Sequence, residues 1–586
     1  MAEALGELTR THTCGALRAE DVGADAIILG WVHRIRDLGG VTFIDVRDRA
    51  GVSQVVVREN DALMTVAKKL RSEFVVGVSG VVQRRSDDTI NPKLATGEVE
   101  VLAREIRILN EAKTPPFQIA EDSPVSEDLR LKYRYLDLRR PRLQHNIGLR
   151  HKLMMAVRKF FDANGFWEIE TPILTRSTPE GARDFLVPSR VHPGEFYALP
   201  QSPQIFKQIL MISGMDRYFQ IVRCFRDEDQ RADRQLEFTQ IDVEMSFARP
   251  DIVYTLIESL MLMIGHEMGV EFNAPFRRMP YADAIATYGS DKPDLRCGLE
   301  IRDLSDVFKD AEFRVFKQIV AEGGTVRGIS VPGGNKYTRN QIDTLVDQAK
   351  QMGFSGLIWV RPGEPPTSSV KALGDATLRA ALDRAGAAKE DLLLMSAGAA
   401  DANSKLLGQL RLAIAKKDNL LSDGMEFLWV EQFPLLEYND EDARWYAMHH
   451  PFTSPLDEDV DKLEDRPGEV RAKAYDLVLN GSEIGGGSIR IHDPALQSRM
   501  FRRLGISDEE AKLRFGFFLD ALAYGTPPHG GIALGVDRIV AILCGESSIR
   551  EVIAFPKTAN AVDLMSDAPS PVDAKQLREL HLKIAP

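Results

Sequence analysis

The chain contains 586 residues, of which 44% are hydrophobic and 27% charged, and its net charge is −12. This length predicts about three to four domains, and the composition excludes low-complexity disorder, a collagen repeat and a disulfide scaffold. No apolar run reaches the roughly 20 residues of a membrane-spanning helix, and the acidic N-terminus is not typical of a secretory signal. The four cysteines are far apart and form no CxxC pair, which predicts a reducing, cytoplasmic location and no zinc knuckle.

The negative net charge argues against nucleic-acid binding, but the charge is unevenly distributed. Residues 129–159 hold ten Lys and Arg side chains against one acid, Asp137. Such a run is typical of a solvated helix face, and it is also typical of a local contact with phosphate groups. The sequence leaves both interpretations open.

The first 112 residues predict a small β-barrel. The expected elements are strands at 26–33, 41–46 and 52–58, a turn at 36–40, a helix at 61–71, and strands at 74–82 and 98–109. Three strands, a helix and two strands is the order of the OB-fold, a barrel that often binds oligonucleotides. Residues 113–142 begin with a polar, proline-containing stretch and are expected to form a linker.

The rest of the chain predicts a larger domain with an insertion. The expected elements are a helix at 143–163, a strand at 166–170, a hairpin with arms at 217–225 and 238–247, and a strand at 530–535 followed by a helix at 536–544. Residues 291–420 alternate strands and helices, as an inserted α/β module does. The prediction is an α+β multidomain protein with the barrel at 1–112, the linker at 113–142, a mainly antiparallel domain at 143–290 and 421–556, the insert at 291–420 and a C-terminal extension at 557–586.

Several nucleotide-binding motifs are absent from the sequence. It contains no GxxxxGK[ST] loop, no GxGxxG and no GxSxG. If the protein uses ATP, arginines and a metal ion must therefore neutralise the phosphates. Arg226 opens a highly charged hairpin loop, and Arg538 begins the helix behind the glycine-flanked strand.

Together these segments resemble a known family. FRDEDQRADRQLEFTQID (225–242) resembles motif 2 of class II aminoacyl-tRNA synthetases, GGIALGVDRI (530–539) resembles motif 3, and the helix and strand ending at Pro172 resemble motif 1, the dimer element. TPEGARDFLVPSR (178–190), LPQSPQIFKQ (199–208), MHHPFTSP (448–455) and NGSEIGGGSIRIH (480–492) are similar to the bacterial-type aspartyl-tRNA synthetases. The resemblance covers nearly the whole chain.

The resemblance implies an aspartate–tRNA ligase. Such an enzyme activates L-aspartate with ATP and Mg²⁺ to aspartyl-adenylate and transfers the aspartyl group to the 3′ end of tRNA(Asp), with tRNA(Asn) as an open second acceptor. It also implies a cytoplasmic homodimer without membrane association, and an anticodon-binding OB domain. An asparagine-specific relative and a non-catalytic tRNA-binding paralogue are the alternatives.

The resemblance also implies roles for individual residues. It assigns catalysis to Arg226 and Arg538. The implied ATP-binding residues are Arg226, Asp227, Glu228, Gln235, Glu483, Gly535, Val536, Asp537 and Arg538. The implied Mg²⁺ ligands are Asp476 and Glu483, since Mg²⁺ takes hard oxygen ligands beside phosphates. The implied aspartate-binding residues are Glu180, Ser202, Gln204, Lys207, Arg226, Asp242, His449 and Arg490.

Two further sets of residues bear on specificity. Lys207 and Arg490 argue against an asparagine enzyme, because two cations suit a carboxylate better than an amide. The implied anticodon-binding residues are Arg36, Phe43 and Gln54. Leu38 stands where a His accompanies relaxed tRNA recognition in the family, so it favours strict recognition of tRNA(Asp). A non-catalytic paralogue would have lost Arg226, Arg538 or Glu483, and all three are present.

Overall fold

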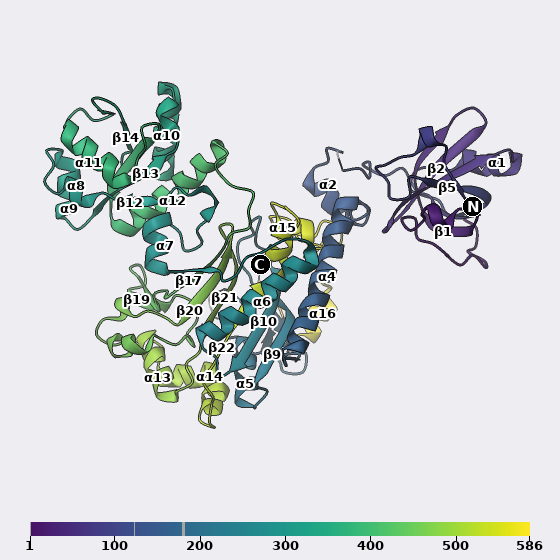
Figure 1. Ribbon diagram of the computed structural model, residues 1–586. Coiled ribbons are helices and arrows are strands. Elements are labelled where there is room, and N and C mark those ends of the chain that lie inside the picture. The colour runs from purple at the N-terminus through teal and green to yellow at the C-terminus, as the bar shows by residue number, and fades with distance from the viewer. Residues whose placement is uncertain (1, 122, 179–181, 586) are drawn as a thin grey trace. The chain divides into compact units, whose positions relative to one another are not determined.

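The computed structural model describes residues 2–121, 123–178 and 182–585, which form two compact units (Figure 1). One unit consists of the residues up to Gly148 together with Arg550–Ser570, and the other of Leu149–Ile549 with the residues from Pro571 onward. Among the described residues, no helix combines the length and the apolar character needed to cross a bilayer.

The first unit contains the predicted barrel. Its elements are β1 (Asp25–Asp37), β2 (Val41–Asp48), β3 (Gly51–Arg58), α1 (Asp61–Lys69), β4 (Val75–Arg84) and β5 (Val99–Asn110). The strands close in the order β1-β2-β3-β5-β4 around a core of alternating Val, Ile and Leu, which confirms the OB-fold. The turn predicted at 36–40 is too long, because β1 stays paired with β2 as far as Asp37 opposite Thr42.

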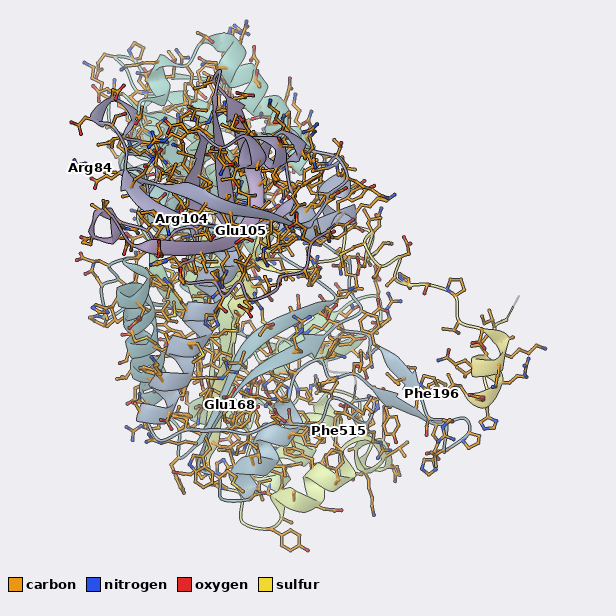
Figure 2. The ribbon with its side chains drawn as sticks, turned by 90° about the vertical axis from the view of Figure 1, so that its right-hand side faces the viewer. Arg84, Arg104, Glu105, Glu168, Phe196 and Phe515 are labelled. Atoms are coloured by element: carbon orange, nitrogen blue, oxygen red, sulfur yellow. The ribbon has the colours of Figure 1, made fainter. Side chains whose placement is uncertain are left out.

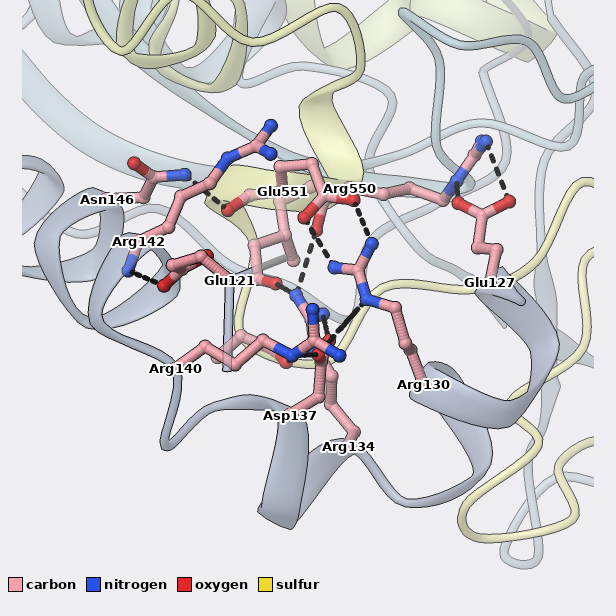
Figure 3. A network of polar contacts seen from close by, with 12 residues as sticks. Glu121, Glu127, Arg130, Arg134, Asp137, Arg140, Arg142, Asn146, Arg550 and Glu551 are labelled. Atoms are coloured by element: carbon pink, nitrogen blue, oxygen red, sulfur yellow. Dashed lines mark hydrogen bonds and ion pairs between the residues drawn. The ribbon is translucent and has the colours of Figure 1, made fainter. Parts of the chain in front are cut away.

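The basic run at 129–159 is largely engaged in ion pairs. In the first unit it spans α2 (Glu127–Lys132), α3 (Arg134–Asp137) and the start of α4 (Pro141–Ala163). The fully buried carboxylate of Asp137 pairs with Arg130, Arg134 and Arg140, as Figure 3 shows. Arg130 also pairs with Glu551 at 2.7 Å. These arginines therefore form neither a solvated helix face nor a phosphate contact, because their partners are carboxylates of the same unit.

The second unit is built on an eight-stranded sheet. Its order is β11 (Arg277–Pro280), β17 (Phe427–Glu431), β20 (Ala474–Leu479), β21 (Ser482–Ile489), β22 (His529–Gly535), β10 (Glu237–Ser246), β9 (Arg217–Phe225) and β6 (Trp167–Glu168). The six central strands pair antiparallel, and only the outer pairings β11–β17 and β6–β9 are parallel. The predicted strand at 166–170 shortens to two residues.

Helices and two hairpins surround this sheet (Figure 1). The helices around it are α4, α5 (Gln204–Ile212), α6 (Pro250–Met268), α7 (Tyr281–Tyr288), α13 (Pro494–Arg503), α14 (Asp508–Leu522) and α15 (Val536–Leu543), whereas α16 (Ala574–Glu579) has no buried residue. The hairpins are β7 (Leu186–Pro188) with β8 (Phe196–Ala198), and β18 (Leu436–Asn439) with β19 (Arg444–Ala447). Phe161 of α4 stacks on Phe219 of β9 with ring centroids 4.8 Å apart, which fixes the helix on the sheet.

The insert folds around a sheet of its own. Its elements are β12 (Ile301–Asp303), α8 (Ser305–Phe308), α9 (Arg314–Ala321), β13 (Thr325–Val331), α10 (Arg339–Met352), β14 (Ile358–Arg361), β15 (Thr367–Ser368), α11 (Asp375–Ala385), β16 (Leu392–Gly398) and α12 (Ala400–Lys417). The sheet order is β12-β13-β16-β14-β15, and every pairing is antiparallel. From β13 to α12 the helices and strands alternate as the sequence predicts, except that β15 directly follows β14.

Candidate active site

A cavity of about 440 Å³ lies over β10, β20, β21 and β22 of the large sheet. It is lined by seven of the eight residues predicted to bind aspartate, and the eighth, Glu180, lies outside the described residues. The seven are Ser202, Gln204, Lys207, Arg226, Asp242, His449 and Arg490. The fold therefore brings widely separated segments of the chain to one place.

Two buried cations and two buried carboxylates form an ion cluster at the base of this cavity. Lys207 lies 3.0 Å from Asp242 and 3.2 Å from Glu244. The Arg490 guanidinium donates two hydrogen bonds of 3.0 Å to the two oxygens of Glu244. All four side chains are at most 2% exposed, so each charge is balanced by its neighbours and not by water.

Glu244 is a site residue that the sequence reasoning missed. Lys207 and Arg490 are expected to face a substrate carboxylate, yet Glu244 already pairs with both. A signal was present, because Asp242 and Glu244 share one face of the strand and alternate with the apolar residues Ile241, Val243 and Met245, so burial of this segment demands partners for both carboxylates. Gly531 of β22 makes the room, since a Cβ there would lie 2.3 Å from Glu244 Oε2.

The two carboxylates of the cluster have opposite titration behaviour. Burial favours the neutral form of Glu244, but Arg490 and Lys207 outweigh it and hold the pKa of Glu244 at about 2. Burial dominates at Asp242 and raises its pKa to about 6, against the attraction of Lys207. Glu244 is therefore a permanent anion, whereas Asp242 can titrate near neutral pH.

The adjacent histidines have different surroundings. His450, which the prediction omitted, has its Nε2 2.7 Å from Nη1 of Arg490 and accepts a hydrogen bond from it. Burial and the Arg490 charge lower the pKa of His450 well below its usual range, so the ring is neutral. His449 lies edge-on to Phe433, with its Nε2 3.8 Å from Asp476.

Asp476 and Glu483, the two predicted metal ligands, lie close together on β20 and β21. A Cβ on Gly486 would lie 2.7 Å from Asp476 Oδ1 and 3.6 Å from Glu483 Oε1, so both oxygens border the same space. The negative charge of Asp476, with burial, raises the pKa of Glu483. Two carboxylates that border the same space repel each other, and a cation bound between them would relieve this repulsion. Within residues 2–121, 123–178 and 182–585, no cluster of three or more His, Cys, Asp or Glu side chains is arranged to hold a metal by itself.

A second cavity of about 240 Å³ adjoins the first. The residues that line both are Arg226, Glu228, Gln240, Glu483 and Ala533. Of the residues predicted to bind ATP, the second cavity is lined by Arg226, Glu228, Gln235, Glu483, Gly535, Asp537 and Arg538. The other two lie differently: Val536 is fully buried, and Asp227 pairs with Arg183 at 3.6 Å.

Arg226 stands where the two cavities meet. Its backbone N–H donates to the carbonyl of Leu236 at 2.8 Å, which closes the charged loop between β9 and β10. Its guanidinium lies 5.0 Å from the centre of the Phe238 ring. Because Arg226 lines both cavities, its guanidinium can contact an anion bound in either one.

Gln201 is a second residue that the sequence reasoning missed. Its side-chain amide donates to the carbonyl of Ala182 at 2.8 Å and accepts from the Ala182 N–H at 3.2 Å. The same amide donates to Asp184, which also accepts from Ser177. Gln201 thus fixes the backbone of a segment that borders the first cavity.

The predicted anticodon residues share one face of the barrel. Arg36 lies opposite Phe43 on the paired strand, with its guanidinium 5.6 Å from the ring centre. Arg36 also donates to Gln54 at 2.7 Å, and Gln54 donates to Glu100 at 2.6 Å, a carboxylate that the prediction omitted. Leu38 follows β1 and is 69% exposed.

Comparison with known proteins identifies the family. The model described as tRNA synthetases class II (D, K and N) matches residues 126–559, and that of an OB-fold nucleic acid binding domain matches residues 26–109. The chain belongs to the class II tRNA synthetases of this group.

Similar curated proteins narrow the assignment. An aspartate–tRNA(Asp/Asn) ligase of Caldanaerobacter subterraneus subsp. tengcongensis is 54% identical, and an aspartate–tRNA ligase of Ruminiclostridium cellulolyticum is 52% identical, each over 100% of both chains. Within its class the protein is therefore a member of the aspartate–tRNA ligases.

Solved structures agree on the fold. An asparaginyl-tRNA synthetase from Pyrococcus horikoshii has a TM-score of 0.58 at 19% identity and covers 93% of this chain and 98% of its own. An aspartyl-tRNA synthetase from Entamoeba histolytica has a TM-score of 0.58 at 19% identity, covering 94% of this chain and 91% of its own.

Proposed function

We propose that the two adjoining cavities hold aspartate and ATP, so that the aspartate α-carboxylate attacks the α-phosphorus next to Arg226. The observation that carries this proposal is the set of residues common to both cavities, above all Arg226, Glu228 and Glu483. The bond between the α-phosphorus and the bridging oxygen breaks, so pyrophosphate leaves and aspartyl-adenylate remains. The aspartyl group then passes to the 3′ end of tRNA(Asp) and AMP is released. Pyrophosphate exchange measured with aspartate and with asparagine tests the proposal, and exchange supported equally by both amino acids would contradict it.

No side-chain nucleophile is needed for this reaction, because the attacking oxygen belongs to the substrate. The enzyme positions two anions and neutralises charge that builds up at the α-phosphate. In this proposal Arg226 bridges the α-phosphate and the aspartate carboxylate, and Arg538 binds the γ-phosphate. Glu228 and Gln235 bind the rest of the nucleotide. Support comes from Arg538, which lines the second cavity and is oriented by a 2.8 Å bond to the Glu483 carbonyl.

Aspartate is recognised by polarity, because asparagine has almost the same shape. Lys207, Arg490 and His449 face the side-chain carboxylate, while Ser202, Gln204 and Asp242 surround the α-amino group; Glu180, predicted for the same role, lies outside the described residues. Support for this assignment comes from Lys207 and Arg490, which both line the first cavity, since an amide NH₂ could not accept a hydrogen bond from either cation.

Asp242 gives the proposed aspartate site a pH dependence. The carboxylate is anionic above its pKa of about 6 and neutral below it. A neutral Asp242 attracts the α-ammonium group less, so we expect the KM for aspartate to rise as the pH falls through about 6. The KM for ATP, measured in the same pH series, is the control. A KM for aspartate that stays flat between pH 5 and 7 would contradict this role.

Asp476 and Glu483 are proposed to hold Mg²⁺. The fit rests on the donor chemistry, since two close carboxylates, one with a raised pKa, suit a hard divalent cation beside phosphates. When bound, Mg²⁺ neutralises phosphate charge. We expect the double variant Asp476→Asn with Glu483→Gln to lose Mg²⁺-dependent pyrophosphate exchange while aspartate binding, followed by calorimetry, survives. A wild-type Mg²⁺ dependence combined with a large drop in Tm would show that these carboxylates are structural.

The barrel, residues 1–112, is proposed to bind the anticodon of the tRNA. The proposed division of the rest of the chain is a linker at 113–142, a catalytic domain at 143–290 and 421–556, an insert at 291–420 and a C-terminal extension at 557–586. Phe43 offers a stacking surface next to Arg36 and Gln54. We expect Phe43→Ala to lower kcat/KM for tRNA(Asp) by about 10–100-fold, from the loss of roughly 1–3 kcal/mol of base stacking. Aspartate-dependent pyrophosphate exchange should be unchanged. An equal loss of both activities would contradict the separation of roles.

A second acceptor, tRNA(Asn), is favoured by the names of similar proteins. The relatives from Caldanaerobacter subterraneus and Halothermothrix orenii are both called aspartate–tRNA(Asp/Asn) ligases. Leu38 favours strict recognition instead. Aminoacylation of purified tRNA(Asp) and tRNA(Asn) side by side decides between the two.

A homodimer in the cytoplasm completes the proposal. Large apolar side chains are exposed along α4 and the segment after it: Met155 (43%), Trp167 (65%), Ile173 (50%) and Leu174 (52%). Exposed large apolar side chains are typical of a subunit interface. Analytical ultracentrifugation of the wild type and of Trp167→Glu tests it, and a wild-type monomer at micromolar concentration would contradict it.

A further inference from the structure

Asp537 and Arg538 are neighbours at the start of α15, but their side chains have different surroundings. Both residues line the second cavity, where the Arg538 guanidinium donates to the Glu483 carbonyl at 2.8 Å. Both oxygens of the Asp537 carboxylate accept hydrogen bonds from the protein itself. Oδ1 accepts from Arg150 of α4 at 2.5 Å, and Oδ2 accepts from the backbone N–H of Thr239 at 2.9 Å. Asp537 is 3% exposed, so these contacts are shielded from water.

The sheet explains why the carboxylate is needed there. The pairing of β10 with β22 ends at Gln240 opposite Gly535, because the chain then turns into α15. Asp537 supplies an acceptor for the next backbone N–H of β10, in place of a strand carbonyl. Arg150 completes the arrangement, because its second guanidinium nitrogen donates to Thr239 Oγ1 at 3.0 Å. One arginine therefore joins α4, β10 and α15.

We propose that Arg150 is a positioning residue for ATP binding: through Asp537 it fixes the first turn of α15 and thereby the arginine that meets the phosphates, Arg538. This inference rests on the ATP role proposed above for Arg538. It also reassigns Asp537, whose carboxylate oxygens serve Arg150 and Thr239 and do not bind ATP. Because α4 also carries part of the proposed dimer face, Arg150 links that face to the nucleotide site.

Two substitutions at Arg150 test the proposal, with a matched control on the same helix. Arg150→Met removes the link. Arg150→Lys keeps the charge, but a single ammonium group cannot reproduce the guanidinium bridge to Asp537 and Thr239. The control is Arg158→Met, two turns further along α4. Arg158 pairs with Glu168 at a distance of 2.9 Å (Figure 2 labels Glu168), and neither residue lines either of the two cavities.

The readouts are the KM for ATP and the KM for aspartate in pyrophosphate exchange, with Tm measured in parallel. We expect Arg150→Met to raise the KM for ATP about tenfold and Arg150→Lys to raise it less, because small displacements of a binding group are costly. The KM for aspartate should stay within about twofold for both variants, and Arg158→Met should match the wild type. In an Asp537→Asn background, Arg150→Met should add little, since the two residues act as a unit.

Two results would overturn the inference. One is a lower Tm in Arg150→Met and Arg150→Lys with both KM values unchanged, which would make the ion pair structural only. The other is an equal rise in both KM values. The Arg538→Met variant separates this inference from the proposed function: if its KM for ATP equals that of the wild type, the role of Arg538 itself is wrong, whatever the Arg150 variants do.

Discussion

Replacing Arg226 by alanine is expected to reduce aspartate-dependent pyrophosphate exchange by about 10²–10³-fold, the usual cost of removing one donor from a transition-state anion site. Arg226 lines both cavities and is oriented by the Phe238 ring, so it is the cation best placed to contact both reacting anions. The fold should persist, because the side chain is only partly buried.

A control variant shows whether replacing any arginine of this domain by alanine reduces pyrophosphate exchange. Arg249→Ala serves, because Arg249 is exposed and pairs with Asp251 beyond the end of β10. Exchange by Arg249→Ala should equal that of the wild type. If Arg226→Ala retained exchange within about tenfold of the wild type, the proposed site of adenylate formation would be wrong.

Arg490→Leu is expected to lower kcat/KM for aspartate by about 10³-fold or more and to narrow the preference for aspartate over asparagine. A site built to bond a particular polar group rejects an analogue by about 10⁴–10⁵, and that discrimination depends on its donors. The KM for ATP should change by no more than a few-fold, since Arg490 borders the first cavity and not the second.

The ion cluster adds a second expected effect. Without Arg490, the buried Glu244 keeps only Lys207, and breaking a buried pair costs about 3–5 kcal/mol of folding stability. The double variant Arg490→Leu with Glu244→Gln removes the unpaired charge, so Tm should recover while aspartate activation does not. An unchanged ratio of aspartate to asparagine activity in the folded double variant would contradict the role of Arg490 in specificity.

Much of the fold could be predicted from local sequence patterns. Alternating Val and Ile residues predicted the barrel strands, and the hairpin arms of β9 and β10 were predicted to within a residue or two. Local signals also mark both ends of α10 (Arg339–Met352), because Thr338 is its N-cap and Gly353 follows its last residue in the left-handed conformation. The segment at 36–40 was less predictable, because the end of a strand depends on its partner as well as on its own residues.

In the candidate site, too, some residues could be predicted from local sequence and others could not. Arg226, Arg538 and the glycine-rich strands are recognisable because they occur in long motifs of fixed spacing. The partners of those residues are not, because an ion pair depends on where the chain folds back on itself. Glu244 and Arg490 are 246 positions apart, and only the antiparallel packing of β10, β22 and β21 brings them together.

The basic run at 129–159 is an example of what the sequence by itself determined and of what only the tertiary structure decided. Composition determined that many arginines lie there, and periodicity determined that several belong to a helix. The tertiary structure decided that Arg139 pairs with Glu73 at 2.6 Å, that Arg150 pairs with Asp537 and that Arg130 pairs with Glu551. The physical reason is that backbone conformation follows from neighbouring residues, whereas a charge is stabilised by whichever opposite charge the fold places beside it in a region that excludes water.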